Sequence, residues 1–192
     1  MPGINEPQPR ANGKASPGAG FNFGLWVAQG FGAGRIPVAP GTFGSVVGVV
    51  WFLALLAPGS IAVYLVGSLA GVFVSVWLCG VGERILNEKD PGSVVLDEII
   101  AMPICFLAVV GIHLWKTGML ATPGHFLQAW PVTLAIFALF RFFDIAKPWP
   151  VHQSQSLPGG WGVTVDDVLA ALYVNVVVVL VYALSQFLGR GG

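Results

Sequence analysis

The feature that most constrains this chain is a set of long apolar segments that carry almost no charge. The residues from Val168 to Leu188 contain no charged side chain, and about 20 apolar residues are enough to cross the hydrocarbon core of a bilayer. Only 9% of the residues are charged and 55% are hydrophobic, whereas about a quarter of the residues of a soluble domain are charged. The sequence therefore predicts an all-α integral membrane protein.

Five segments are predicted to be membrane-embedded helices, and the first of them is short. They cover approximately residues 43–56, 61–78, 99–115, 126–143 and 168–188. A short interfacial or packed helix is expected at residues 21–31, and a glycine- and proline-rich loop at Gly32 to Ser45. Residues 21–192 would then form a single domain, a bundle of about four to five helices. Residues 1–20 have no apolar run, so they are predicted to be a disordered tail without a secretory signal.

The basic residues are distributed unevenly between the two ends of these helices. With five spans, Lys116 and Arg190 lie on one side, and the other seven of the nine Lys and Arg residues lie on the opposite side. Because Lys and Arg accumulate in cytoplasmic loops, the second side is predicted to face the cytoplasm. The formal net charge is zero, and the absence of a broad basic surface argues against a nucleic-acid partner.

The acidic residues gather at the same predicted end. Asp97 and Glu98 are expected to open the third span, and Asp166 and Asp167 the fifth. The helix dipole alone favours acids there, and Thr164 with Asp167 has the spacing of a capping box. Clustered carboxylates nevertheless repel one another, and a bound Mg²⁺ would remove that repulsion by taking oxygen ligands. The predicted metal ligands are Asp97, Glu98, Asp144, Asp166 and Asp167.

The segment FRFFDIAKPWP places three charges at the end of an apolar run. Arg141, Asp144 and Lys147 follow an i, i+3, i+6 spacing, so they are neighbours on one helix face. One interpretation is a salt-bridge ladder near the membrane surface. The other is a metal-binding aspartate between two cations that hold a phosphate. The glycine-rich loop is predicted to contribute further contacts to the anion, at Gly41, Thr42 and Ser45.

Four segments together resemble the phosphatidylglycerophosphatase A family of bacterial membrane lipid phosphatases. They are PGTFGS, DPGSVVLDE, FRFFDIAKPWP and GWGVTVDDVLA, and the resemblance covers roughly residues 31–180. It implies Mg²⁺-dependent hydrolysis of phosphatidylglycerol phosphate to phosphatidylglycerol, at the cytoplasmic face of the bacterial inner membrane. Asp97, Asp144 and Asp167 are the catalytic candidates, since a carboxylate can position or deprotonate the attacking water. Arg141 and Lys147 would neutralise the phosphate.

Several alternatives stay open at this point. A covalent intermediate on an aspartate is an alternative to direct attack by water. A cysteine nucleophile is set aside, because Cys79 and Arg84 are separated by four residues rather than five. A Mg²⁺-dependent phospholipid transferase would also need clustered aspartates, on adjacent helices. A small cation transporter or cation-binding protein would need polar groups near the middle of the membrane, where Asn175 and Gln128 are the nearest candidates.

Overall fold

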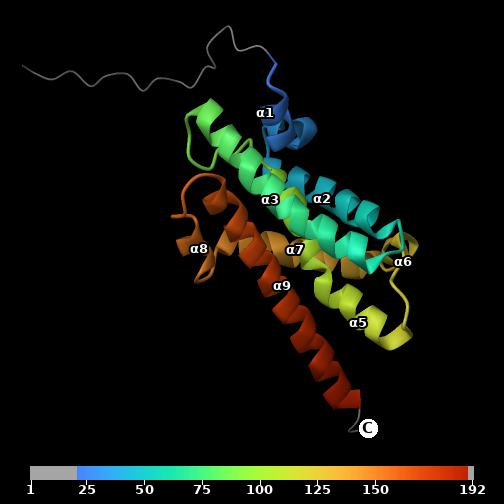
Figure 1. Ribbon diagram of the computed structural model, residues 1–192. Helices are drawn as coiled ribbons and strands as arrows, with labels where there is room; N and C mark the ends of the chain where they lie inside the picture. Colours follow the sequence, from blue (N-terminus) through green and yellow to red (C-terminus); the bar gives the residue numbers. More distant parts are fainter. Residues whose placement is uncertain (1–20, 190–192) are drawn as a thin grey trace, which may run out of the picture.

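The computed structural model describes residues 21–189, which contain helices, turns and loops but no strand (Figure 1). The all-α class is therefore confirmed. The predicted disordered tail, residues 1–20, lies outside the described residues. The elements are α1 (Phe23–Ala28), η1 (Gly30–Arg35), α2 (Pro40–Leu56), α3 (Ile61–Leu86), α4 (Leu96–Cys105), α5 (Leu107–Thr117), α6 (Pro123–Gln128), α7 (Trp130–Ala146), α8 (Val151–Ser154) and α9 (Gly160–Gly189).

The helices form a bundle with the properties of a membrane protein. Three helical segments are long and apolar enough to cross a bilayer, namely α3, α4 with α5, and α9. Both α2 and α7 have 17 residues, which gives a length of about 26 Å at 1.5 Å per residue. That length is slightly less than the roughly 30 Å of a hydrocarbon core. The five predicted segments thus correspond to α2, α3, α4–α5, α6–α7 and α9.

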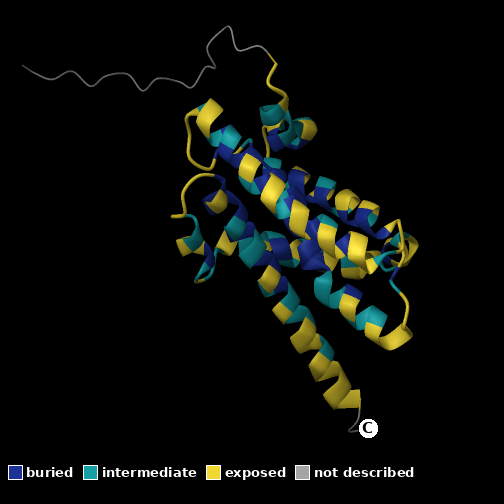
Figure 2. Cartoon of the chain, viewed as in Figure 1, coloured by how far each residue is buried: buried dark blue, intermediate teal, exposed yellow. Residues whose placement is uncertain are grey.

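Helix α4 is the centre of this bundle. It packs on α2, α3, α7 and α9, and nearly all of its residues are buried. Figure 2 shows buried residues concentrated where the helices meet, and exposed residues along the outer faces of α3 and α9. Those outer faces are themselves apolar, with exposed side chains such as Val66, Leu69 and Leu180. An apolar outer surface of this kind is suited to contact with lipid.

The start of α2 differs from the sequence prediction. The motif PGTFGS was expected to belong to a loop, but α2 begins at Pro40. Proline is compatible with the first position of a helix, where its missing N–H would have no partner. The glycines of this helix allow close packing on α4. A Cβ atom at Gly44 would lie 2.8 Å from Cβ of Val95, and one at Gly48 would lie 2.5 Å from Cγ of Met102.

The start of α9 also differs from the prediction. The helix begins at Gly160, so Asp166 and Asp167 lie in its second turn rather than opening it. The predicted capping box is wrong, because Thr164 is inside the helix and its hydroxyl lies 2.9 Å from the Ser75 hydroxyl of α3. A glycine is needed at position 160, since a Cβ atom there would overlap the main-chain carbonyl of Val76.

A break separates α4 from α5, and Asn175 of α9 bonds to both sides of it. Helix α4 contains Pro103 and ends at Cys105. The Asn175 amide donates to the Ile104 carbonyl at 2.7 Å, and its side-chain oxygen accepts from the Ala108 N–H at 2.7 Å. Helix interruptions in a membrane persist where neighbouring groups satisfy the freed backbone. Asn175 therefore has a structural role, which weakens the interpretation of this residue as part of a transport path.

Candidate functional site

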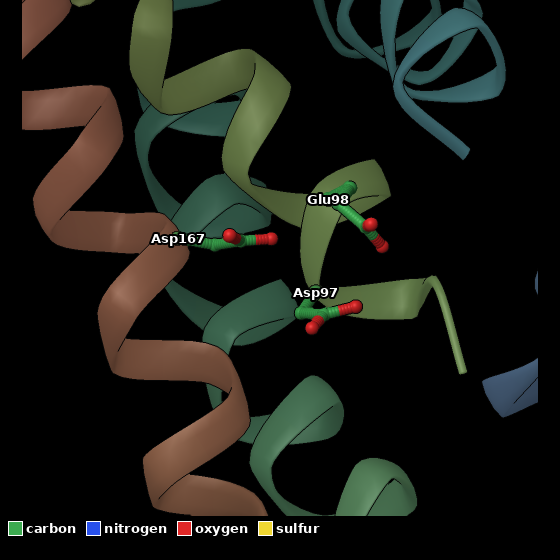
Figure 3. Close-up of side chains that lie close together, drawn as sticks. All are labelled: Asp97, Glu98 and Asp167. Carbon is green, nitrogen blue, oxygen red and sulfur yellow. The ribbon is translucent and has the colours of Figure 1, made fainter. Parts of the chain in front are cut away.

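Three carboxylates meet where α4 begins and the second turn of α9 passes it. Asp97 and Glu98 lie in the first turn of α4, as predicted, and Asp167 lies on α9. One oxygen from each side chain lies within 4.8 Å of the others. Figure 3 shows Asp167 projecting from α9 toward the start of α4, which carries Asp97 and Glu98. Asp97 and Asp167 are buried, with only 6% and 3% of their surface exposed.

Each of these side chains has an oxygen that is left unsatisfied. Asp97 Oδ1, Glu98 Oε2 and Asp167 Oδ2 are buried and have no hydrogen-bond partner among the described residues. Burying a carboxylate oxygen without a partner is costly, and several like charges increase that cost. A divalent cation would compensate for it, and a set of carboxylate oxygens suits a hard cation such as Mg²⁺. The three residues therefore fit a metal ion.

The other two predicted ligands are paired with cations instead. Arg141 Nη1 lies 2.8 Å from Asp144 Oδ2 and 3.7 Å from Glu98 Oε1. Lys147 Nζ lies 2.5 Å from Asp166 Oδ2 and 3.8 Å from Asp144 Oδ1. The ladder read from the i, i+3, i+6 spacing is thus present, and Asp144 is its middle member. The ladder contacts the carboxylate cluster through the ion pair between Arg141 and Glu98.

Lys147 is held in a specific position. It ends α7 with a left-handed backbone, φ 42°, a conformation that is uncommon for a residue other than glycine. Burial by itself lowers the pKa of Lys147. The hydrogen bond to Asp166 and the charges of Asp166, Asp144 and Asp167 outweigh burial, so the pKa is raised above its ordinary value. Lys147 is consequently a cation at neutral pH.

Gln155 is a residue of this region that the sequence analysis missed. Its side-chain amide donates to Asp166 Oδ2 at 3.1 Å and reaches Asp90 Oδ2 at 3.5 Å. It follows α8, a helix of four residues, and no spacing or charge in the sequence distinguishes it from the neighbouring polar residues. Only the return of the chain from α7 to α9 brings it to the site.

The predicted anion-binding residues of α2 are only partly brought together. A Cβ atom at Gly41 would collide with Glu98 Oε1 and lie 3.1 and 3.2 Å from the terminal nitrogens of Arg141, so a side chain at this position would displace both site residues. The Ser45 hydroxyl donates to the Gly41 carbonyl at 2.8 Å and accepts from Arg141 Nη1 at 3.5 Å. The Thr42 side chain makes no hydrogen bond within residues 21–189; its backbone N–H bonds to Ala39.

Chemically, the arrangement combines a cation site with two positive side chains. The carboxylate cluster of Asp97, Glu98 and Asp167 can hold a metal ion. Arg141 and Lys147 lie beside it and have the geometry and charge to bind phosphate oxygens. All these residues lie near one end of the membrane helices, where the phosphate of a lipid would be found. A phosphorylated lipid headgroup is therefore the kind of ligand that this site fits.

Comparison with known proteins agrees with this chemistry. The profile of the family described as phosphatidylglycerophosphatase A matches residues 26–182. Phosphatidylglycerophosphatase A of Haemophilus influenzae is 35% identical over 153 residues, which cover 79% of this chain and 84% of that protein. The protein of the same name from Escherichia coli is 32% identical over 148 residues, 76% of each chain.

A third relative carries a different name. A Bacteroides thetaiotaomicron protein, provisionally named a phosphatidylinositol-3-phosphatase, is 36% identical over 151 residues, 77% of this chain and 86% of that protein. No solved structure gives a significant match. The family profile covers the whole site, from α2 to α9. On this evidence, the chain belongs to the phosphatidylglycerophosphatase A family.

Proposed function

We propose that this protein is a Mg²⁺-dependent lipid phosphatase of phospholipid biosynthesis. It removes the terminal phosphate of phosphatidylglycerol phosphate and leaves phosphatidylglycerol and inorganic phosphate. Family membership supports the substrate. The observation that carries the chemistry is the set of three carboxylates with unsatisfied buried oxygens next to Arg141.

The residues have distinct tasks in this proposal. Asp97, Glu98 and Asp167 hold the Mg²⁺, which when bound polarises a phosphate oxygen and acidifies water. Arg141 and Lys147 neutralise the doubly charged phosphomonoester and orient it. Asp144 contacts both cations and keeps them directed at the phosphate. Asp166 fixes Lys147, and Gln155 in turn fixes Asp166.

The reaction itself is a hydrolysis by direct attack of water. A carboxylate accepts a proton from the water whose oxygen forms the new bond to phosphorus. The bond between phosphorus and the glycerol oxygen breaks on the opposite side of the phosphorus. That oxygen takes up a proton from solvent, and the carboxylate later releases its own proton to solvent. The candidates for this base are Asp97, Asp144 and Asp167. Gly41 and Ser45 belong to α2 and form one side of the site.

The site is further proposed to face the cytoplasm of a bacterial inner membrane. Within residues 21–189, every Lys and Arg except Lys116 lies at the end of the bundle that holds the site. Basic residues accumulate on the cytoplasmic side of membrane proteins. The lipid tails would stay in the bilayer while the headgroup reaches the mouths of α4 and α9.

Phosphate release by the purified protein in detergent tests the proposal. The substrates are phosphatidylglycerol phosphate, phosphatidic acid and phosphatidylinositol 3-phosphate, each measured with Mg²⁺ and with excess chelator. The expected result is metal-dependent release that is fastest from phosphatidylglycerol phosphate. Equal rates with chelator would contradict the metal site, and preference for either other lipid would contradict the substrate.

A further inference from the structure

Three elongated apolar grooves run along the surface of the bundle between neighbouring helices. Their volumes are about 510, 520 and 460 Å³. The third, called here the α2–α7 groove, has one wall from each of the two helices it is named after. The residues used below are Val46, Val49 and Leu53 of α2 and Thr133, Leu134 and Phe137 of α7.

The α2–α7 groove exists because its two walls are held apart by a third helix. Both α2 and α7 pack on α4, but they are not closely packed on each other. Residues Phe126 and Leu127 of α6 close the end that lies away from the site. A half-exposed strip of apolar surface remains between the two helices, at the depth of the bilayer.

The other end of this groove is directed toward the candidate site, where α2 begins and α7 ends. Ser45 immediately precedes Val46, and Arg141 lies one helical turn beyond Phe137. Arg141 Nη1 reaches the Ser45 hydroxyl at 3.5 Å, so the two walls are bridged by polar side chains at this end. Arg141 in turn contacts Glu98 and Asp144. The apolar lining of the groove thus ends within about one helical turn of Ser45 and Arg141, two residues assigned to the site.

The other two grooves end at residues of a different kind. The groove between α2 and α3 also reaches Leu96 and Ile99, which flank Asp97 and Glu98 in the chain, but its lining is apolar throughout and includes no cationic side chain. The groove between α5, α7 and α9 contains its polar residues, including Lys116 and His113, at the opposite end of the bundle. Of these three grooves, only the α2–α7 groove points at Arg141, the cation assigned to the phosphate.

This combination matches the two parts of a phosphorylated lipid. From Val46 to Leu53 the apolar wall extends about 10 Å along α2, at 1.5 Å per residue, which suits a segment of an acyl chain. The guanidinium of Arg141 at the end of the wall suits a phosphate. Gly41 lets α2 lie close to Glu98 and Arg141 at this end, where a Cβ atom would collide with Glu98.

We propose that the substrate lipid enters the site sideways from the bilayer, between α2 and α7. One acyl chain lies in the α2–α7 groove, and the headgroup turns past Gly41 and Arg141 toward the carboxylate cluster. This inference rests on the proposed function, because it names the path of that substrate. It makes Val46, Val49 and Leu134 contacts of the lipid tail, although they lie well away from the reacting phosphorus.

Two adjacent valines of α2 provide a matched test. Val46 lines the α2–α7 groove, whereas Val47 lines the groove between α2 and α3. Val46→Trp would fill the proposed path, and Val47→Trp would place the same indole in the other groove of the same helix. Each purified variant is assayed on long-chain phosphatidylglycerol phosphate in mixed micelles and on its water-soluble dihexanoyl analogue.

The measured quantity is the ratio of kcat/KM for the long-chain lipid to kcat/KM for the short-chain analogue. Val46→Trp is expected to lower this ratio about tenfold, since losing good contacts with a few methylene groups is worth about that factor. Val47→Trp is expected to leave it unchanged. An unchanged ratio for Val46→Trp, or an equal decrease for Val47→Trp, would overturn the proposed path.

A second pair of variants covers the case in which Val46→Trp does not fold. Leu134→Trp alters the α7 wall of the same groove, and Val132→Trp places a tryptophan in the groove shared with α5 and α9. The same change in ratio is expected for Leu134→Trp alone. Wild-type protein that hydrolyses neither substrate would refute the proposed function itself, a result distinct from an unchanged ratio.

Discussion

At the scale of single residues, the site concentrates negative charge that the protein alone does not neutralise. Arg141 and Lys147 are shared among Glu98, Asp144 and Asp166. Asp97 and Asp167 are buried and take part in no ion pair within residues 21–189. Their charges are consequently unfavourable to folding unless a cation is bound. Function and stability are expected to conflict at these two positions.

Asp167→Asn is expected to abolish phosphatase activity and to stabilise the metal-free protein. The substitution removes one buried charge and supplies an amide that can donate to a neighbouring carboxylate, a gain of about 1–2 kcal/mol in the free energy of unfolding. Thermal unfolding in detergent with chelator measures this gain. A variant less stable than wild type under those conditions would contradict this account of the cluster.

Addition of Mg²⁺ is expected to stabilise the wild-type protein more than the Asp167→Asn variant. Wild type should gain about 2.7 kcal/mol at a Mg²⁺ concentration 100 times its dissociation constant. Asp167→Asn, which lacks one of the three proposed ligands, should gain much less at the same concentration. Similar thermal shifts for the two proteins would exclude Asp167 from the metal site. Na⁺ at matched ionic strength controls for screening of charge.

Lys147→Ala is expected to weaken substrate binding. Loss of one charge-assisted contact to phosphate should raise KM for phosphatidylglycerol phosphate about tenfold, with a smaller effect on kcat. Lys89→Ala is the control, because Lys89 is an exposed lysine at the same end of the bundle and is not part of the ladder. An unchanged KM for Lys147→Ala would remove this residue from the site.

At the scale of elements, the position of the site depends on how closely α2 approaches α4. Glycines at 41, 44 and 48 form the contact side of α2. They bring Ser45 of α2 near Arg141, and Gly41 near Glu98. A wider separation of α2 and α4 would move one wall of the site away from the carboxylates. Packing between helices is therefore part of the geometry of the site.

The same substitution at two helical glycines tests this packing. Gly48→Ala is expected to destabilise the protein by about 1–3 kcal/mol, because its Cβ would meet Met102 at 2.5 Å in a filled interface. Gly111→Ala on α5 has no neighbour within 4 Å and should stabilise the helix by up to about 1 kcal/mol. Thermal unfolding compares both with wild type. Equal effects would show that α2 is not tightly packed on α4.

At the scale of the whole molecule, the asymmetry of charge predicts one orientation in the membrane. Lys89 is exposed at the end that holds the site, and Met119 is 70% exposed near the opposite end. The two native cysteines, Cys79 and Cys105, are buried, so they should not react with a membrane-impermeant maleimide. A single introduced cysteine can therefore report which face is accessible.

Labelling in a bacterial expression host measures the orientation. Met119→Cys is expected to react in intact spheroplasts, and Lys89→Cys only after the cytoplasmic membrane is made permeable, because the basic end is proposed to lie in the cytoplasm. The unsubstituted protein is the control for the buried cysteines. Reaction of Lys89→Cys in intact spheroplasts would reverse the proposed orientation.

The sequence by itself determined the features that depend on local composition and spacing. Runs of apolar residues predicted the membrane helices, because the length of hydrocarbon to be crossed sets the length of the run. The ladder of Arg141, Asp144 and Lys147 was readable because residues three apart on a helix are neighbours. The combination of four polar motifs also indicated the family before any contact was known.

Only the tertiary structure decided which charges meet. Five carboxylates were equivalent candidates in the sequence, but three lie together while Asp144 and Asp166 are paired with cations. The true starts of α2 and α9 were missed for a related reason. Gly44 and Gly160 weaken a helix locally, yet they permit close packing on α4 and α3. Such contacts join residues far apart in the chain, and spacing along one segment carries no information about them.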